Sequence, residues 1–345
     1  MSSASHHAHT DFANVGRAPW YRRGFFASQT AYVLVAFIVI AVIMALLSPA
    51  FLKSGNLYNV AQNFSYIAIV SLGSTIVIIT GGIDLSVGSV IALSAIVTAM
   101  AFNACEAMGL SAVPGLVLLI ACLAGLGVSI LVGLINGTLI AKVGLSPFVT
   151  TLGMLSIARG LCYIVTEGRG QAPAGVDKAL MTSITKGEIL GLPMPLIYLA
   201  LLSVVMGLSL RHTAWGRHLF ALGGNEKAAA LTGVNVDRMK ISAYVLCSLS
   251  AGFAGILMVG WLGSAPANLA TGYELRVIAS SVIGGANLAG GSGGPVGAVL
   301  GAALIEVIRN GLVLARVNPY WQDAFVGLII ILAVLVDRFR ARRAT

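Results

Sequence analysis

The stretch RHTAWGRHLFALGGNEKAAALTGVNVDRMK, residues 211–240, is the one long charged and turn-rich interval in a chain that is otherwise almost continuously apolar. Its Lys and Arg residues outnumber its acids, so the positive-inside rule predicts that it lies on the cytoplasmic side of a membrane. Gly223, Gly224 and Asn225 predict a turn. The good helix formers EKAAAL that follow predict a short helix with its acid in the first turn, ended by Gly233.

A short helix between two membrane spans, fixed by glycine turns, suits two roles. It can pass a push from a soluble partner into the membrane, or it can be an ordinary connecting loop with a surface helix. Composition alone leaves both roles open.

The composition places the chain among polytopic membrane proteins. Apolar residues make up 58% and charged residues 10% of the 345 residues, whereas soluble domains average about 25% charged residues. The net charge of +9 comes from basic residues that flank apolar stretches, so we interpret it as membrane topology and not as a nucleic-acid surface. The four cysteines show no metal-type spacing, which indicates neither a disulfide framework nor a metal site.

Charge-free stretches predict an all-α fold of about ten transmembrane helices between two tails. We expect residues 1–23 to be a disordered cytoplasmic tail, residues 24–337 the transmembrane domain and residues 338–345 a basic cytoplasmic tail. About 20 apolar residues suffice to span a bilayer. The spans are predicted at 24–52, 54–83, 85–105, 107–141, 143–166, 189–210, 241–273 and 320–336, with 277–305 split into two spans at 284–295.

Both termini are expected on the cytoplasmic side. Ten spans put the two ends of the domain on one side, and roughly two-thirds of the 21 Lys and Arg residues fall in the intervals on that side. The interval 167–188 is then the largest external loop.

Two glycine-rich segments share the pattern GGx[DN]LxxG. Residues 81–88 read GGIDLSVG and residues 284–291 read GGANLAGG. A true repeat predicts a transporter of two related halves, with non-helical backbone at corresponding places lining a cavity. The span count makes the copies parallel, and one re-entrant segment would make them inverted. Chance matching of glycine-rich text is the alternative.

Charged residues near membrane depth have two interpretations each. Asp84 precedes a small-residue helix, so its simplest role is the N-cap of the third span, while the alternative is a pathway acid. Glu306 and Arg309 are three residues apart and are expected to neutralise each other. Arg159 lies within a span and is a structural anchor first and a pathway residue second.

Enzyme chemistry is not indicated. Gly290 to Gly293 read GGSG, but a serine nucleophile needs a base, and the histidines outside the first tail lie in the charged interval 211–240. No GxxxxGK[ST] motif occurs, so the chain itself is not expected to hydrolyse ATP. We predict neither a catalytic residue nor a cofactor. The glycines, including the GxxxG pairs at 133–137 and 297–301, are better explained as close helix packing.

Five motifs resemble one family. They are TGGIDLSVGS at 80–89, GRHLFALGGNEKAAALTGVNV at 216–236, ATGYEL at 270–275, GGANLAGG at 284–291 and LAVLVD at 332–337. In this order they resemble the ribose-type permease subunits of bacterial ABC importers. Arg276 departs from the family pattern, in which an acid often follows GYEL.

The resemblance implies a bacterial inner-membrane protein with three partners: a second permease chain, a separate ATP-binding subunit below the membrane and a periplasmic sugar-binding protein above it. It also implies a set of residues in the coupling loop 211–240 that dock on the ATPase. These are Gly216, Arg217, Gly223, Gly224, Asn225, Glu226 and Gly233.

We therefore predict a permease that moves a neutral monosaccharide or related polyol into the cytoplasm. The alternative is an ion-coupled secondary transporter in which Asp84 and Glu306 are coupling acids. The two glycine-rich segments and their small-residue helices predict close packing against a second permease chain. The candidate translocation residues are Asn63, Asp84, Ser86, Asn136 and Thr150.

Overall fold

The computed structural model of the protein describes residues 29–318, 321, 324, 327–328 and 331. The two predicted tails and most of the predicted span 320–336 lie outside the described residues. Within the described part, eight helices are long and apolar enough to cross a membrane, which confirms the all-α polytopic membrane fold. They are α1 (Gln29–Leu47), α2 (Ser54–Ile79), α3 (Val87–Ala107), α4 (Leu116–Ala141), α5 (Pro147–Thr166), α7 (Met194–His212), α10 (Val236–Leu262) and α12 (Pro295–Leu314).

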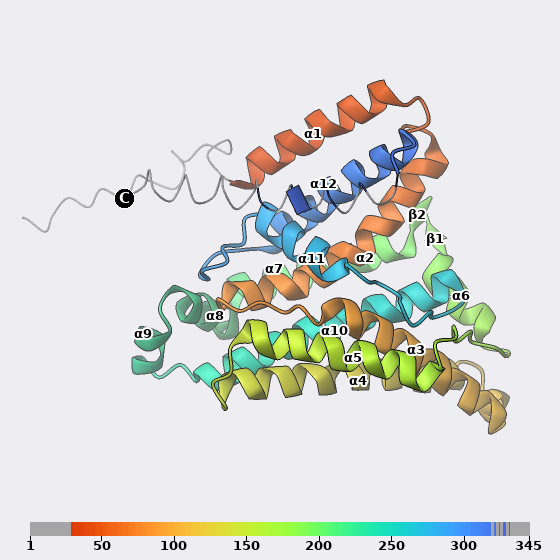
Figure 1. Ribbon diagram of the computed structural model, residues 1–345, viewed down its shortest axis with the longest axis horizontal. Helices are drawn as coiled ribbons and strands as arrows, with labels where there is room; N and C mark the ends of the chain where they lie inside the picture. The colour runs from red at the N-terminus through yellow and green to blue at the C-terminus, as the bar shows by residue number, and fades with distance from the viewer. Residues whose placement is uncertain (1–28, 319–320, 322–323, 325–326, 329–330, 332–345) are drawn as a thin grey trace, which may run out of the picture.

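Shorter elements join these helices. They are η3 (Leu110–Ala112), α6 (Lys178–Lys186), β1 (Glu188–Ile189), β2 (Leu192–Pro193), α8 (Ala214–Gly224), α9 (Glu226–Leu231) and α11 (Tyr273–Ile283). The strands β1 and β2 pair antiparallel as a small hairpin. In Figure 1, α8 and α9 lie at one end of the bundle and α6 with the hairpin at the other. We call these the α8 end and the α6 end.

The core of the bundle is formed by α2, α3 and α10, with α4 packed closely on α10. Gly133 and Gly137 of α4 make this approach possible. A Cβ atom at Gly133 would stand 2.7 Å from the Cα of Val245, and one at Gly137 would stand 2.8 Å from the Cα of Ile241. The first GxxxG pair is thus a contact face, as predicted, and the contact is within the chain.

The second GxxxG pair joins α12 to α11. The Cα atoms of Gly297 and Gly301 lie against the carbonyl oxygens of Gly284 and Ser280, where a Cβ atom has no room. Both glycines of this pair therefore make their close contact inside the chain. The packing of the glycine-rich segments against a second permease chain stays a prediction.

The eighth predicted span is not a full helix. The helix α11 has 11 residues and a length of roughly 16 Å, whereas the hydrocarbon core of a bilayer is about 30 Å thick. Residues 263–272 were predicted as the end of the span 241–273, but they are not helical and run into the bundle. Ala265 pairs with Gln171 of the α6 end through two backbone hydrogen bonds, and the Ala270 carbonyl lies against Gly88 in the first turn of α3. A non-helical segment and a short helix thus cross the bundle together.

The long loop between α5 and α7 is fixed to the α6 end by acids. The Asp177 carboxylate accepts hydrogen bonds from the backbone N–H groups of Gly115 (3.0 Å) and Leu118 (3.4 Å), which are unpaired donors at the start of α4. Glu106 at the end of α3 accepts from the Val176 N–H at 3.0 Å. The loop therefore caps the start of α4 through Asp177 and is tied to the end of α3 through Glu106.

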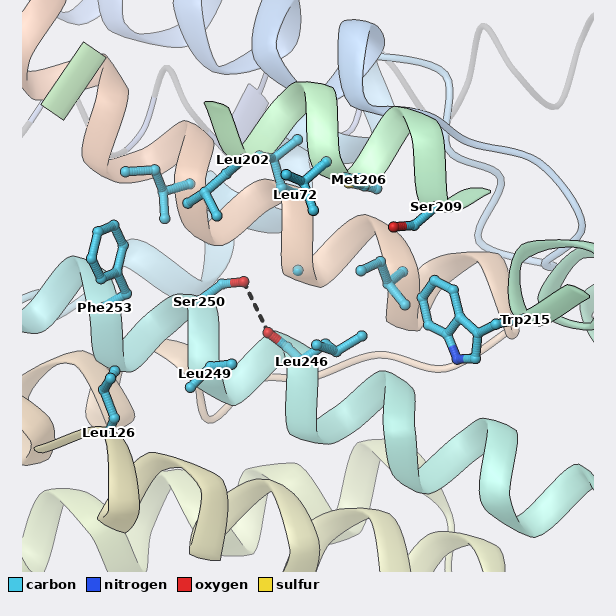
Figure 2. A pocket seen from close by; sticks show the side chains of 14 residues that line it. Leu72, Leu126, Leu202, Met206, Ser209, Trp215, Leu246, Leu249, Ser250 and Phe253 are labelled. Atoms are coloured by element: carbon cyan, nitrogen blue, oxygen red, sulfur yellow. Dashed lines mark hydrogen bonds between the residues drawn. The ribbon is translucent and has the colours of Figure 1, made fainter. Parts of the chain in front are cut away.

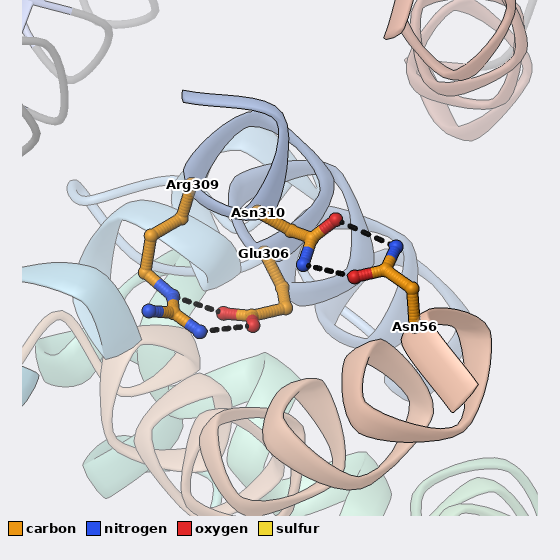
Figure 3. A network of polar contacts seen from close by, with 4 residues as sticks. All are labelled: Asn56, Glu306, Arg309 and Asn310. Atoms are coloured by element: carbon orange, nitrogen blue, oxygen red, sulfur yellow. Dashed lines mark hydrogen bonds and ion pairs between the residues drawn. The ribbon is translucent and has the colours of Figure 1, made fainter. Parts of the chain in front are cut away.

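Two polar pairs tie α12 to its surroundings near the α6 end (Figure 3). Asn56 at the start of α2 and Asn310 of α12 exchange two amide hydrogen bonds, of 3.0 and 2.9 Å. Glu306 is buried and forms a bidentate ion pair with Arg309, as predicted from their spacing. Because α2 begins where α12 ends, these two helices run antiparallel.

The reciprocal amide pair gives a stability prediction. Asn310→Leu leaves the Oδ1 atom of half-buried Asn56 without its donor, while Asn56 Nδ2 keeps the Phe51 carbonyl at 2.9 Å. An unsatisfied polar group costs about 1–3 kcal/mol when it is buried. We expect a lower unfolding midpoint of the detergent-solubilised protein for this variant. The double variant Asn56→Leu with Asn310→Leu removes both polar groups and should recover part of the loss. A double variant that is as unstable as the sum of the two single changes would contradict this account.

Candidate functional site

Three side-chain caps shape the connection between α7 and α10. Thr213 accepts from the Gly216 N–H at 3.1 Å and begins α8, Asn225 accepts from the Ala228 N–H at 3.0 Å and begins α9, and Asn235 begins α10 in the same way. The predicted helix over EKAAAL has the bounds Glu226–Leu231 in the structure. It ends before Gly233, whose φ of 87° suits glycine.

The helix α8 was not predicted. Gly223 and Gly224 are its last two residues, so the turn expected at Gly223 to Asn225 is reduced to Asn225. Gly216 is buried against the carbonyl of Leu210, where a side chain has no room, and Arg217 is exposed. The helix buries Leu219 and Leu222, an i, i+3 pair that was the available signal for it.

The two glycine-rich segments form two breaks between helices at the α8 end. The first break, residues 80–86, follows α2, and the second, residues 284–294, follows α11. Ser281 donates to the Ser71 carbonyl and Val282 packs beside Ile78, so α11 runs alongside α2 in the same direction. Both copies of the repeated pattern therefore lead towards the α8 end and back, which is the parallel arrangement given by the span count.

The same local turn recurs in both breaks. In the first, Asp84 Oδ1 accepts from the Ser86 N–H at 2.9 Å, and in the second, Asn287 Oδ1 accepts from the Ala289 N–H at 2.9 Å. Asp84 is therefore not the N-cap of the third span. The helix α3 begins at Val87, and Asp84 shapes the turn that precedes it.

Gly223 of α8 touches both breaks. The Gly291 N–H of the second break donates to the Ile79 carbonyl, next to the first break, at 2.9 Å. A Cβ atom at Gly223 would collide with that Ile79 oxygen and would stand 2.5 Å from the Gly291 nitrogen. At the adjacent Gly224, no other atom lies within 4 Å of such a Cβ. The end of α8 is thus fitted against the point where the two breaks meet.

Three of the candidate translocation residues form one buried cluster behind the first break. Ser86 Oγ donates to Asp84 Oδ1 at 2.6 Å and accepts from Asn136 Nδ2 at 3.1 Å. All three side chains are buried, and Tyr244 of α10 donates to the nearby Ile83 carbonyl at 3.3 Å. This cluster fixes the position of the break on α4 and α10.

The other two candidates lie elsewhere. Thr150 is buried near the start of α5 and donates to the Ser146 carbonyl of its own chain segment at 3.0 Å. Asn63 is half-buried in α2. The structure does not bring Asn63 or Thr150 into hydrogen-bonding contact with the Asp84 cluster.

A cavity of about 400 Å³ opens between the first break, the turn from α4 to α5 and the loop with α9. Glu226 and Lys240 line it and form an ion pair of 2.7 Å, in which the Glu226 side chain is 52% exposed. Glu226 thus has a basic partner within the chain. The cavity is lined by Thr80, Gly81, Gly82, Ile140, Ala141, Gly144, Leu145, Ser146, Pro147, Glu226, Lys240 and Tyr244.

A second cavity, of about 320 Å³, lies between α2, α7 and α10 (Figure 2). Its walls are almost wholly apolar, with Leu202, Met206 and Phe253 among them. The Ser250 hydroxyl donates to the Leu246 carbonyl at 2.9 Å. This cavity therefore lacks the convergent polar groups that fix the orientation of a hydrophilic ligand.

Comparison with known proteins agrees with the fold. The model of one protein family, described as branched-chain amino acid transport system / permease component, matches residues 56–334. The chain is 39% identical over 325 residues to a probable ABC transporter permease protein of Sinorhizobium fredii, covering 93% of each chain.

Two sugar permeases are similar over nearly the whole length. The ribose import permease protein RbsC of Escherichia coli is 39% identical over 305 residues, 88% of this chain and 92% of that protein. The galactose/methyl galactoside import permease protein MglC of Escherichia coli is 36% identical over 322 residues, 90% of this chain and 94% of that protein. The chain therefore belongs to this family of ABC transporter permeases, and its predicted resemblance to the ribose-type members is confirmed.

Proposed function

We propose that the chain is the transmembrane permease subunit of an ABC importer that moves a monosaccharide or related polyol into the cytoplasm. The ribose and galactose permeases among its relatives support the substrate class. The observation that carries the mechanism is the contact of Gly223 with both breaks, because it joins a loop outside the bundle to the non-helical backbone inside it. An ion-coupled transporter needs no such connection.

The α8 end is the cytoplasmic side in this proposal. Its exposed basic residues, among them Arg217 and Lys227, follow the positive-inside rule, and the proposal assigns both termini to this side. The ATP-binding subunit docks on α8 and α9. The loop 211–240 is the coupling loop. The segment of it that docks contains Gly216, Arg217, Gly223, Gly224, Asn225, Glu226 and Gly233, in which the glycines shape the backbone. A sugar-binding protein in the periplasm then meets the α6 end, where Asp177 and Glu106 hold the outer loop in place.

The geometry explains how a push on α8 reaches the membrane. A helix end packed backbone to backbone has no flexible side chain that can absorb a displacement, so a shift of Gly223 moves Ile79 and Gly291 with it. The hydrogen bonds of the Asp84 cluster attach the first break to α4, and the Tyr244 bond to the Ile83 carbonyl attaches it to α10. A second permease chain completes the pathway, since one chain of this size forms only one wall. Asn63, Asp84, Ser86, Asn136 and Thr150 remain the candidate translocation residues.

The function is tested by uptake. The permease, reconstituted with its ATP-binding subunit and its binding protein, should import labelled ribose or galactose only when ATP is supplied. Leucine is the control, because the family description names branched-chain amino acids. ATP-independent uptake driven by a proton or sodium gradient would establish the ion-coupled alternative instead.

The two adjacent glycines of α8 supply a matched pair of variants. Gly223→Ala forces a methyl group into the contact with Ile79 and Gly291, and overpacking of this kind costs about 1–3 kcal/mol. Gly224→Ala adds the same methyl group where nothing lies within 4 Å. We expect Gly223→Ala to lose most ATP-driven uptake while it still inserts and binds the ATPase, and Gly224→Ala to keep it. Equal uptake by the two variants would refute the coupling role of this contact.

Asp84 separates the two transport mechanisms. Its Oδ1 accepts from the backbone and hydroxyl of Ser86, and an asparagine oxygen can accept both bonds, as Asn287 does from Ala289 in the second break. Asp84→Asn should therefore keep most uptake, whereas Asp84→Leu should lose it. A coupling acid tolerates neither change. Abolished uptake in a normally expressed Asp84→Asn variant would favour ion coupling.

A further inference from the structure

The crossing segment, residues 264–272, is non-helical backbone inside the bundle. At one end Ala265 pairs with Gln171 of the outer loop, and at the other the Ala270 carbonyl reaches Gly88 in the first turn of α3. The helix α3 begins inside the bundle, since Ile91 in its second turn lies against Gly255 of α10, and the outer contact at Gln171 lies at the α6 end. The segment between these two contacts therefore lies at the depth of the membrane-spanning helices. Figure 1 shows it as the thin tube that leads into α11.

Arg159 holds the crossing segment in place. It is located within α5, and its Nη1 atom donates to the carbonyl oxygens of Ala267 (2.8 Å) and Leu269 (2.9 Å). These carbonyls have no helix to satisfy them, so the guanidinium replaces the missing backbone donors. Ala270 has a φ of 54°, which is a costly conformation for a residue with a Cβ atom and often marks a functional constraint. Arg159 is thus the structural anchor that the sequence predicted.

The segment presents two different faces. Ala265, Ala267 and Leu269 are buried, and between and beyond them Asn268 and Thr271 are exposed. Residues 267–272 form successive turns, with backbone bonds from Leu269 to Pro266 and from Thr271 to Asn268, and these turns place the apolar side chains on the protein and the two polar ones outside. The exposed side of the crossing segment itself is therefore polar and uncharged. Ser156 of α5 is exposed as well, but Leu152 and Ile157 on the same helix expose apolar side chains.

A lipid surface does not fit this face. Irregular backbone within the hydrocarbon region occurs only where it is buried in protein or lines a water-filled cavity. The exposed residues of α7 give the contrast within the same chain, since Leu201, Val204 and Leu208 are all apolar. Asn268 and Thr271 would each place a polar group in lipid at the same depth, which is costly.

From this geometry we infer that the crossing segment, held by Arg159 of α5, lines the water-filled route of the sugar, with Asn268 and Thr271 as its contacts. The inference deepens the proposed function and rests on it. The Asn268 amide can donate and accept hydrogen bonds, and the Thr271 hydroxyl, which donates to the Asn268 carbonyl at 2.8 Å, can still accept them, which matches the hydroxyl groups of a neutral sugar. None of the candidate translocation residues predicted from the sequence lies in this segment.

The test uses single cysteines in the complete importer, reconstituted with its ATPase and binding protein. Cys105, Cys162 and Cys247 are buried, and Cys122, which is half-buried, is first replaced by alanine. The three test variants are Asn268→Cys, Thr271→Cys and, as the matched control on the apolar face, Val204→Cys. A charged methanethiosulfonate reagent reacts with the thiolate form, which exists in water and not in lipid, so we expect Asn268→Cys and Thr271→Cys to react about tenfold faster than Val204→Cys.

Saturating sugar during ATP-driven turnover should slow the labelling of Asn268→Cys and Thr271→Cys, and labelling should block uptake. If the unlabelled importer transports sugar but both cysteines react no faster than the control, the inference is wrong and the proposed function stands. If the importer transports no sugar, the proposed function fails first. A cysteine variant that does not assemble is replaced by Asn268→Ser or Thr271→Ser, which should change the KM for sugar if these residues meet it and leave it unchanged if they do not.

Discussion

Every peptide group that leaves a helix inside a membrane needs a partner from the protein itself, because lipid offers none. The chain meets this constraint in three ways. In the two breaks, one backbone serves the other through Gly291 and Ile79. A neighbouring side chain serves the turn at Asp84 and at Asn287. In the crossing segment, the guanidinium of Arg159 serves two carbonyls. These three non-helical segments, the two breaks and the crossing segment, are therefore each held by specific hydrogen bonds from within the chain.

Glycine makes these arrangements possible where it removes a Cβ atom from a contact between backbones. The α4–α10 contact, the α11–α12 contact and the contact of α8 with the breaks all depend on this. Such contacts transmit displacement well, because they contain no rotatable side chain. The partners in these three contacts all belong to the same chain.

The sequence predicted the features that depend on nearby residues. The bounds of α9 follow from a run of helix formers before a glycine, the Glu306–Arg309 pair from an i, i+3 spacing, and the two breaks from paired glycines. The prediction from sequence failed where a local pattern fits two structures or where the interacting residue is distant in the sequence. The paired glycines at the end of α8 read as a turn, and the apolar residues around Asn268 read as the end of a span. The cap that Asp177 provides to α4 joins residues 62 positions apart, which no local pattern reveals.

The position of Gly223 has a consequence for the mechanics of the whole permease. One helix end rests where the two breaks meet, and Gly291 of the second break donates to the Ile79 carbonyl beside the first at the same point. In the proposed coupling, a displacement of α8 therefore reaches both breaks at once, and the two breaks act as one lever.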